Sequence, residues 1–154
     1  MMIKSVCRVF LLTIALALPN LAQPNEALAD DTPPSALAAP DQQAIRQVIE
    51  SQLDAFQHDD GAKAFGFATP VLQEKFGDPA TFMQMVKQGY TPVYRPRSVA
   101  FEKLVDTQQG PDQILRLVGP DGLTYAAHYL MQKQPDGSWM INGCYLTRLK
   151  DQSV

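Results

Sequence analysis

The sequence predicts an α+β domain in which helices come first and then cover one face of a twisted antiparallel sheet. Up to Gly89, apolar residues recur at spacings of three to four, which is the period of amphipathic helices. After Gly89 the period changes to two, which is typical of half-buried strands. Two turns that contain proline, Gly119-Pro120-Asp121-Gly122 and Pro135-Asp136-Gly137-Ser138, indicate hairpins between antiparallel neighbours.

The longest predicted helix begins at Asp41, because aspartate is a favourable N-cap residue. Its buried stripe is formed by apolar residues one turn apart: Ile45, Val48, Ile49, Leu53 and Phe56. Asp60 is placed to cap a second, shorter helix that carries Ala64, Phe65 and Ala68.

Two further helical pieces follow. Pro70 fits the first position of another helical turn. The next helix has the clearest boundaries, with Asp78 as N-cap, Pro79 at its first position and Gly89 as its stop. We expect its buried face to consist of Phe82, Met85 and Val86.

Four strands are expected in the second half of the chain, at residues 98–106, 113–118, 123–134 and 139–148. Pro92 and Pro96 flank Tyr94, and proline cannot donate to a strand ladder. The segment around Tyr94 is therefore expected to be an edge or an irregular connection.

Residues 1–29 have the pattern of a signal peptide. Lys4 and Arg8 form a basic region, and a short apolar run follows over residues 9–18. Because a bilayer span needs about 20 apolar residues, an uncleaved anchor is the less favoured alternative. We therefore expect an exported protein, either periplasmic or secreted.

The cleavage pattern sets the expected domain boundaries. Ala27-Leu28-Ala29 fits the small-residue pattern at a cleavage site and places the mature start at Asp30, with Ala22 as an earlier alternative. Residues 30–40 are rich in proline and alanine and are expected to form a disordered linker. Residues 41–150 then form the single domain.

Charge and cysteine content limit the expected partners. The whole chain has a formal net charge of −3, and removing Lys4, Arg8 and Glu26 with the signal peptide leaves −4. A mildly acidic domain binds nucleic acid and anionic membranes poorly, so we expect neither partner after processing. Cys7 lies in the signal segment, and Cys144 alone cannot form an internal disulfide. We expect no metal and no cofactor.

Several stretches resemble a known family. The run AFQHDDGAKAFGFATP over residues 55–70 is similar to the opening of nuclear-transport-factor-2-like domains. The closing segments over 126–129 and 139–146 are more specific. Together with Phe76-Gly77 and Tyr90-x-Pro92, they resemble the exported Gram-negative bacterial family catalogued as domain of unknown function 4864.

This resemblance implies a cone-shaped α+β fold in which N-terminal helices pack on a curved antiparallel sheet and leave a pocket. It also implies that a homodimer could form through the outer sheet face. It implies no particular activity, because that superfamily includes isomerases, dehydratases and non-catalytic binding modules.

The candidate catalytic residues come from the closing hairpin. If Gln134 pairs with Ser138, His128 faces Cys144 on one side of the sheet. A thiol beside an imidazole is a candidate nucleophile, although buried cysteines more often act as small apolar residues. A register slip of one residue would separate the pair.

The same register places Tyr125, Tyr129 and Tyr145 together on the opposite face, towards the long helix. Side chains of this size more often form core than a ligand site, so ordinary core packing is the favoured interpretation. Buried tyrosine hydroxyls need partners, however, which makes these three the candidate ligand-binding residues. Arg95 is expected with Arg97 at the mouth of the sheet, where Arg95 is a candidate to receive an anion; a pair of solvated loop arginines is the favoured alternative, because isolated arginines ordinarily lie on the surface.

Two functions from different classes follow. The first is non-enzymatic binding of a small amphipathic molecule or a protein partner. The second is a cofactor-free isomerase or lyase in the same pocket. An isomerase needs a buried carboxylate base. The acidic residues fall mostly at predicted caps and turns instead, so the first function is favoured.

Overall fold

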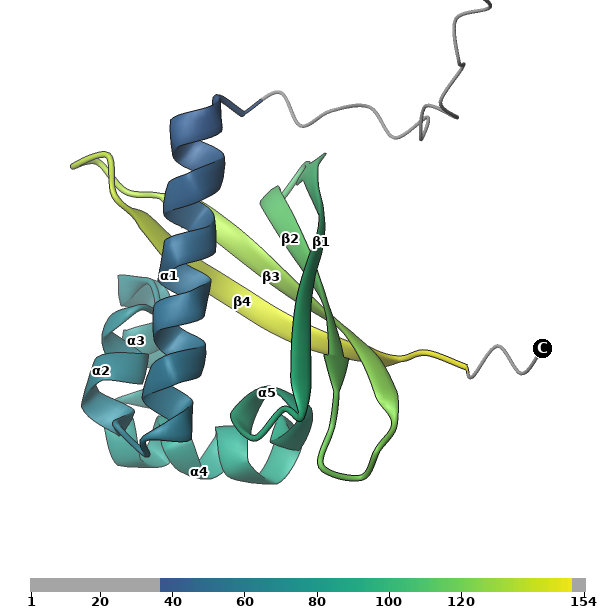
Figure 1. Cartoon of the computed structure of the whole chain (residues 1–154). Helices are drawn as coiled ribbons and strands as arrows, with labels where there is room; N and C mark the ends of the chain where they lie inside the picture. Colours follow the sequence, from purple (N-terminus) through teal and green to yellow (C-terminus); the bar gives the residue numbers. More distant parts are fainter. Residues whose placement is uncertain (1–36, 151–154) are drawn as a thin grey trace, which may run out of the picture. The chain divides into compact units, whose positions relative to one another are not determined.

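The structure is a computed structural model that describes residues 37–150. In this part of the chain the helices precede the strands, as predicted (Figure 1). The helices are α1 (Ala39–Gln57), α2 (Gly61–Gly66), α3 (Pro70–Phe76), α4 (Pro79–Gly89) and α5 (Thr91–Tyr94). The strands are β1 (Ser98–Thr107), β2 (Gly110–Val118), β3 (Thr124–Lys133) and β4 (Trp139–Arg148). The expected signal peptide and most of the expected linker lie outside the described residues.

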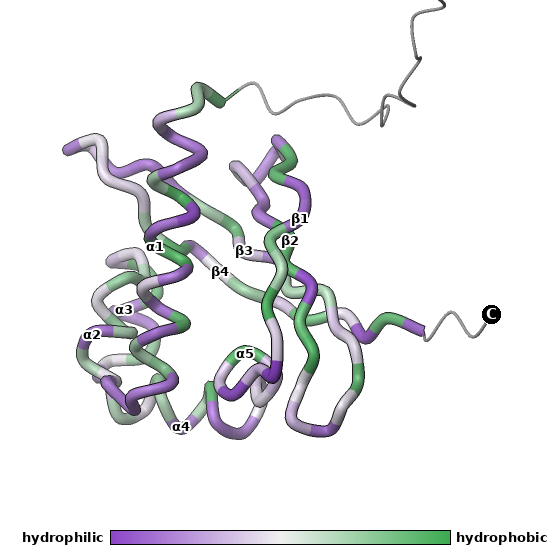
Figure 2. The backbone as a smooth tube through the Cα atoms, in the orientation of Figure 1, coloured by the Kyte–Doolittle hydropathy of each residue, from purple (hydrophilic) through white to green (hydrophobic). Residues whose placement is uncertain are grey.

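The four strands form one antiparallel sheet in the order β1-β2-β3-β4. The sheet is curved, and α1 lies across one of its faces (Figure 1). Hydrophobic and hydrophilic residues alternate along α1 and along the strands (Figure 2). The hydrophobic core therefore lies between the helices and the inner face of the sheet, and the predicted fold class of helices packed on a curved antiparallel sheet is confirmed. Its fully buried side chains include Ile45, Ile49, Phe56, Leu115, Leu117 and Tyr129.

Local capping explains the short helices. Asp78 Oδ1 accepts hydrogen bonds from the backbone N–H groups of Ala80 and Thr81, at 2.8 and 2.9 Å. Asp60 Oδ1 accepts from Lys63 N–H at 3.0 Å. These bonds satisfy donors that would otherwise lack a partner at a helix start, so both predicted caps are confirmed. In α4, Phe82 and Val86 are buried as expected, Met85 is partly buried against the core, and Met83 is buried as well.

The start of α1 differs from the prediction. The helix begins at Ala39 with Ala38 as N-cap, because Pro40 fits the first helical turn. Asp41 is therefore not the cap. Its Oδ1 instead accepts hydrogen bonds from Trp139 Nε1 at 2.8 Å and Lys133 Nζ at 2.9 Å, which tie α1 to the β3–β4 hairpin.

The segment before β1 also differs. The structure gives Thr91–Tyr94 as a single helical turn, α5, with a proline in its first turn. A proline at this position loses no helical hydrogen bond, so it favours a turn of helix as much as an irregular connection. The prediction of an edge segment or irregular connection at Tyr94 was wrong.

The register of the last hairpin is the main correction. Met131 pairs with Ile141, as predicted, but Leu130 pairs with Gly143, so Asn142 is an extra residue in β4. Beyond this bulge Tyr129 pairs with Cys144, and His128 pairs with Tyr145. One extra residue moves every later side chain of β4 to the other face of the sheet. The predicted pairing of His128 with Cys144 was therefore wrong.

Candidate functional site

A cavity of about 490 Å³ lies between the helices and the β3–β4 half of the sheet. The helices supply most of its apolar wall, including Phe56 from α1, Leu72 and Phe76 from α3, and Met85 and Val86 from α4. The sheet supplies Tyr129, Ile141 and Cys144. A concave, mostly apolar site of this size is typical of small-molecule pockets.

The short helices are held against β4 by backbone pairing next to this cavity. Thr69 N–H donates to Ile141 C=O at 2.9 Å, and Ile141 N–H donates to Phe67 C=O at 2.8 Å. Thr69 Oγ1 also bonds Asn142 Oδ1 at 3.1 Å. These contacts fix the bulge and hold the start of α3, so they position the part of the wall that contains Leu72 and Phe76.

The cavity wall contains a buried hydroxyl group without a partner. The Tyr129 side chain is 0% exposed, and its hydroxyl has no hydrogen-bond partner among the described residues. Burial raises the pKa of this hydroxyl well above its ordinary value, so it stays neutral. Most buried polar groups in proteins have partners, so this hydroxyl is a donor that a molecule in the cavity can use.

Two neighbouring groups are polar but uncharged. Tyr90 Oη donates to Cys144 C=O at 3.0 Å, and burial raises the pKa of this tyrosine. The Cys144 thiol has a pKa raised to about 12, chiefly by burial and also by the nearby Asp112. Because a thiolate is the reactive form of cysteine, Cys144 is a poor nucleophile in this environment.

Lys75, in the last turn of α3, is the one charged side chain among the described residues that line the cavity. Gln52 and Asn142 add amide groups to the lining. The amide nitrogen of Gln52 is engaged, because its Nε2 donates to Ala64 C=O at 3.1 Å. No group of three or more His, Cys, Asp or Glu among residues 37–150 is arranged to hold a metal ion.

His128 lies on the outer face of the sheet, away from Cys144. Its Nδ1 is 2.8 Å from Asp112 Oδ2, and its ring stacks on Tyr145 with centroids 4.3 Å apart. Asp112 is buried, and its Oδ1 has no partner among the described residues. The structure therefore joins His128 to a carboxylate and an aromatic ring rather than to the thiol.

The three candidate tyrosines do not share one site. Tyr129 lies on the inner face and lines the cavity, as predicted, whereas Tyr145 is 46% exposed on the outer face, so the prediction that Tyr145 also faces α1 was wrong. Tyr125 packs at the edge of the core and donates to Asp121 Oδ2 at 2.6 Å. It borders a separate hollow beside Pro92 and Pro120.

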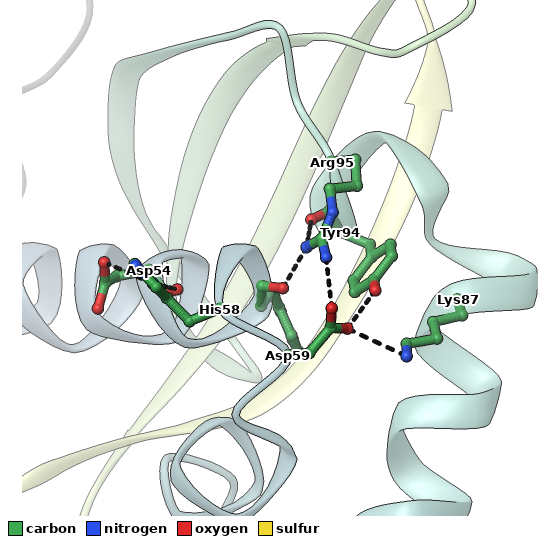
Figure 3. Close-up of polar contacts among 7 residues, drawn as sticks. Asp54, His58, Asp59, Lys87, Tyr94 and Arg95 are labelled. Atoms are coloured by element: carbon green, nitrogen blue, oxygen red, sulfur yellow. Dashed lines mark hydrogen bonds and ion pairs between the residues drawn. The ribbon is translucent and has the colours of Figure 1, made fainter.

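The Arg95 side chain is held by contacts with other residues of the domain (Figure 3). Its guanidinium donates to Asp59 Oδ2 at 2.8 Å and to Phe56 C=O, and it stacks on the Tyr94 ring. Tyr94 Oη and Lys87 Nζ also contact Asp59. This Asp59 cluster, made of Asp59, Lys87, Tyr94 and Arg95, links the end of α1 to α4 and α5, which flank the cavity. The anion next to Arg95 is Asp59 itself.

The hydrogen bond from Tyr94, followed by the contact with Lys87, lowers the pKa of Asp59 to about 2. Asp59 also has a positive φ of 56°, which few residues other than glycine, asparagine and aspartate adopt. The side-chain contacts therefore hold an unusual backbone turn between α1 and α2.

The candidate analysis of the sequence missed Lys75, Tyr90 and Gln52 as lining residues. Two of them lie in or next to motifs that were part of the family resemblance: Tyr90 is in Tyr90-x-Pro92, and Lys75 precedes Phe76-Gly77. No motif in the sequence singled out Lys75 itself.

The fold and the cavity define a small α+β domain in which helices cover a curved sheet and enclose one side of an apolar pocket. The chain belongs to the family of domain of unknown function DUF4864, whose model matches residues 38–154. The fold is also similar to that of ActVI-ORFA from Streptomyces coelicolor, determined at 2.1 Å, with 14% sequence identity and a TM-score of 0.46. That similarity covers 77% of this chain and 100% of the other. None of the curated proteins matches this sequence.

Among the described residues, no helix is both long enough and apolar enough to cross a membrane.

Proposed function

We propose that this domain binds a small amphipathic molecule in the cavity between α1, α3, α4 and the sheet. The observation that carries the proposal is the cavity itself, about 490 Å³ of mostly apolar wall with a few polar groups. Sites of this size and composition bury most of the surface of a small ligand, and apolar burial contributes roughly 25 cal/mol per Å².

The polar groups of the lining favour binding over catalysis. An isomerase or lyase needs a group that accepts a proton near the substrate. The polar groups of the described lining residues are a thiol with a pKa of about 12, two neutral tyrosines, two amides and the Lys75 ammonium, which donates hydrogen bonds rather than accepting a proton; there is no carboxylate and no imidazole. These groups are suited to forming hydrogen bonds with a bound molecule.

Export is part of the same proposal and is supported by the sequence pattern of residues 1–29. A binding domain that acts outside the cytoplasm would meet its ligand in the periplasm or the medium. N-terminal sequencing of the protein recovered from periplasmic and membrane fractions tests export, with a mature start near Asp30 as the expected result.

Binding is tested with N-phenyl-1-naphthylamine, an uncharged probe that fluoresces in apolar surroundings. The expected result is a saturable increase in fluorescence that is lost in Leu72→Trp, because the indole fills the cavity beside α3. Val71→Trp is the matched control, since Val71 is the preceding residue, is 68% exposed and does not line the cavity.

Both variants are first checked for folding by urea denaturation. Saturable binding by wild type and Val71→Trp, but not by Leu72→Trp, supports the proposal. If the wild type shows no saturable signal, or if Leu72→Trp binds as well as Val71→Trp, the cavity is not a binding site and the proposal fails.

A further inference from the structure

The cavity has a positive charge at its wall. Lys75 lies in the last turn of α3, immediately before Phe76, and both side chains line the cavity. Every other described residue that lines it is apolar or carries an uncharged polar group. A charged ligand would therefore meet a single type of charge in this site.

Lys75 is also unpaired. Other lysines of the domain form ion pairs, such as Lys63 with Asp54 at 3.2 Å and Lys87 with Asp59 at 3.0 Å. The Lys75 side chain is exposed, and its ammonium forms no ion pair or hydrogen bond with any residue in the described range 37–150. Glu74 precedes it in α3 but does not line the cavity, so no carboxylate there competes for the Lys75 ammonium.

The groups that could become negative in this site are held neutral. Burial raises the pKa of Tyr90 and Tyr129, and it raises the pKa of Cys144 to about 12. At pH 7 the wall therefore carries the charge of Lys75 and no opposing charge from the other lining residues. Lys75 is exposed to solvent at the edge of the cavity, so an ion pair with a ligand there is worth up to about 1 kcal/mol.

We propose that the ligand is an amphipathic anion, with an apolar body against the helices and one acidic group that pairs with Lys75. The acidic group is a carboxylate or a comparable singly charged head group, as in a fatty acid or an aromatic acid. This inference rests on the proposed function and specifies the class of ligand. The net charge of the whole protein would not attract such an anion, because the chain is net negative and repels anions at long range. Any preference for an anionic ligand must therefore come from Lys75.

The test compares two probes with the same aromatic skeleton. N-Phenyl-1-naphthylamine is uncharged, and 8-anilinonaphthalene-1-sulfonate adds one sulfonate. Lys75→Gln should weaken binding of the sulfonate by up to about fivefold, as expected for loss of an exposed ion pair worth up to about 1 kcal/mol, and should leave binding of the neutral probe unchanged. Lys75→Arg should keep the affinity for the sulfonate.

Lys63→Gln is the control, because it removes the same charge from a lysine that does not line the cavity. It should leave both affinities unchanged. Raising the salt concentration should weaken binding of the sulfonate to the wild type and affect the neutral probe little, because salt screens ion pairs.

The outcomes separate the two claims. If Lys75→Gln leaves sulfonate binding unchanged, or weakens both probes equally, the anion inference fails while the cavity remains a binding site. If Lys63→Gln lowers the affinity for the sulfonate as much as Lys75→Gln does, the effect comes from the total charge of the protein, and the inference also fails. If neither probe binds the wild type in a saturable way, the proposed function itself fails.

Discussion

The Tyr129 hydroxyl has no hydrogen-bond partner among residues 37–150, so we predict that Tyr129→Phe raises the free energy of unfolding, whereas most substitutions in a core lower it. The ring is 0% exposed and keeps its packing after the change, while one oxygen atom is removed. That oxygen loses its hydration on folding and gains no hydrogen bond from the described residues. A buried polar group without a partner costs about 1–3 kcal/mol.

The opposing effect is small. Removing the oxygen loses a few van der Waals contacts of about 0.1–0.2 kcal/mol each. The net gain in the free energy of unfolding is therefore about 1–2 kcal/mol. With an m-value of about 2 kcal/mol/M in urea, the midpoint should rise by about 0.5–1 M at unchanged m.

Tyr90→Phe is the matched control, because it removes the same atom from a tyrosine whose hydroxyl donates to Cys144 C=O. Losing that hydrogen bond should cost about 0.5–1.5 kcal/mol, so the two variants should shift the urea midpoint in opposite directions. If Tyr129→Phe instead destabilises the protein as much as Tyr90→Phe, the Tyr129 hydroxyl has a partner, such as a bound water molecule, and the reasoning is refuted.

Two further predictions concern the rest of the fold. Asp59→Asn should destabilise the protein at pH 7, because it removes the charge that Arg95 and Lys87 bind while asparagine still tolerates the positive φ. The pKa of Asp59 in the folded protein is lowered from 3.8 to about 2. The difference in free energy of unfolding between the wild type and Asp59→Asn is therefore complete above pH 3.8 and disappears as the pH falls through about 2. Urea midpoints across this range test it, with Glu50→Gln as an exposed control, and an advantage that persists below pH 2 would contradict it. Ile141→Ala should cost about 2–5 kcal/mol in the same assay, because Ile141 is 3% exposed. His128→Gln should cost less, since an amide can still donate to Asp112; a larger loss for His128→Gln would invert the assignment of the sheet faces.

Local signals in the sequence were sufficient for most of the element boundaries. Asp78 followed by Pro79 defines a helix start through bonds that span three residues or fewer, so a short stretch of sequence contains the whole cause. The same holds for the turn at Pro135-Asp136-Gly137, where Gly137 N–H donates to Gln134 C=O at 2.9 Å. The strands between such turns then follow from their period of two.

Residues whose role depends on distant partners were not predictable in this way. Asp41 looked like an N-cap, but its partners Lys133 and Trp139 are more than 90 positions away. Arg95 was interpreted as one of a pair of solvated loop arginines or as an anion-binding residue, and its partner Asp59 lies in the turn after α1. In both cases tertiary packing set the partner, so no local pattern in the sequence could indicate it.

The bulge at Asn142 shows how one such contact changes the chemistry of the site. The hairpin turn alone predicts that His128 faces Cys144, and this register holds as far as the pair of Met131 and Ile141. There the segment before α3 pairs with β4, and Thr69 bonds Asn142, 73 positions away. The extra residue turns Cys144 inward beside Tyr129 and leaves His128 outside with Asp112. Among the described residues, the thiol therefore has no imidazole beside it to activate it, and burial keeps it protonated. The bulge that removes this candidate nucleophile thus also makes Cys144 an uncharged part of the cavity that Lys75 lines.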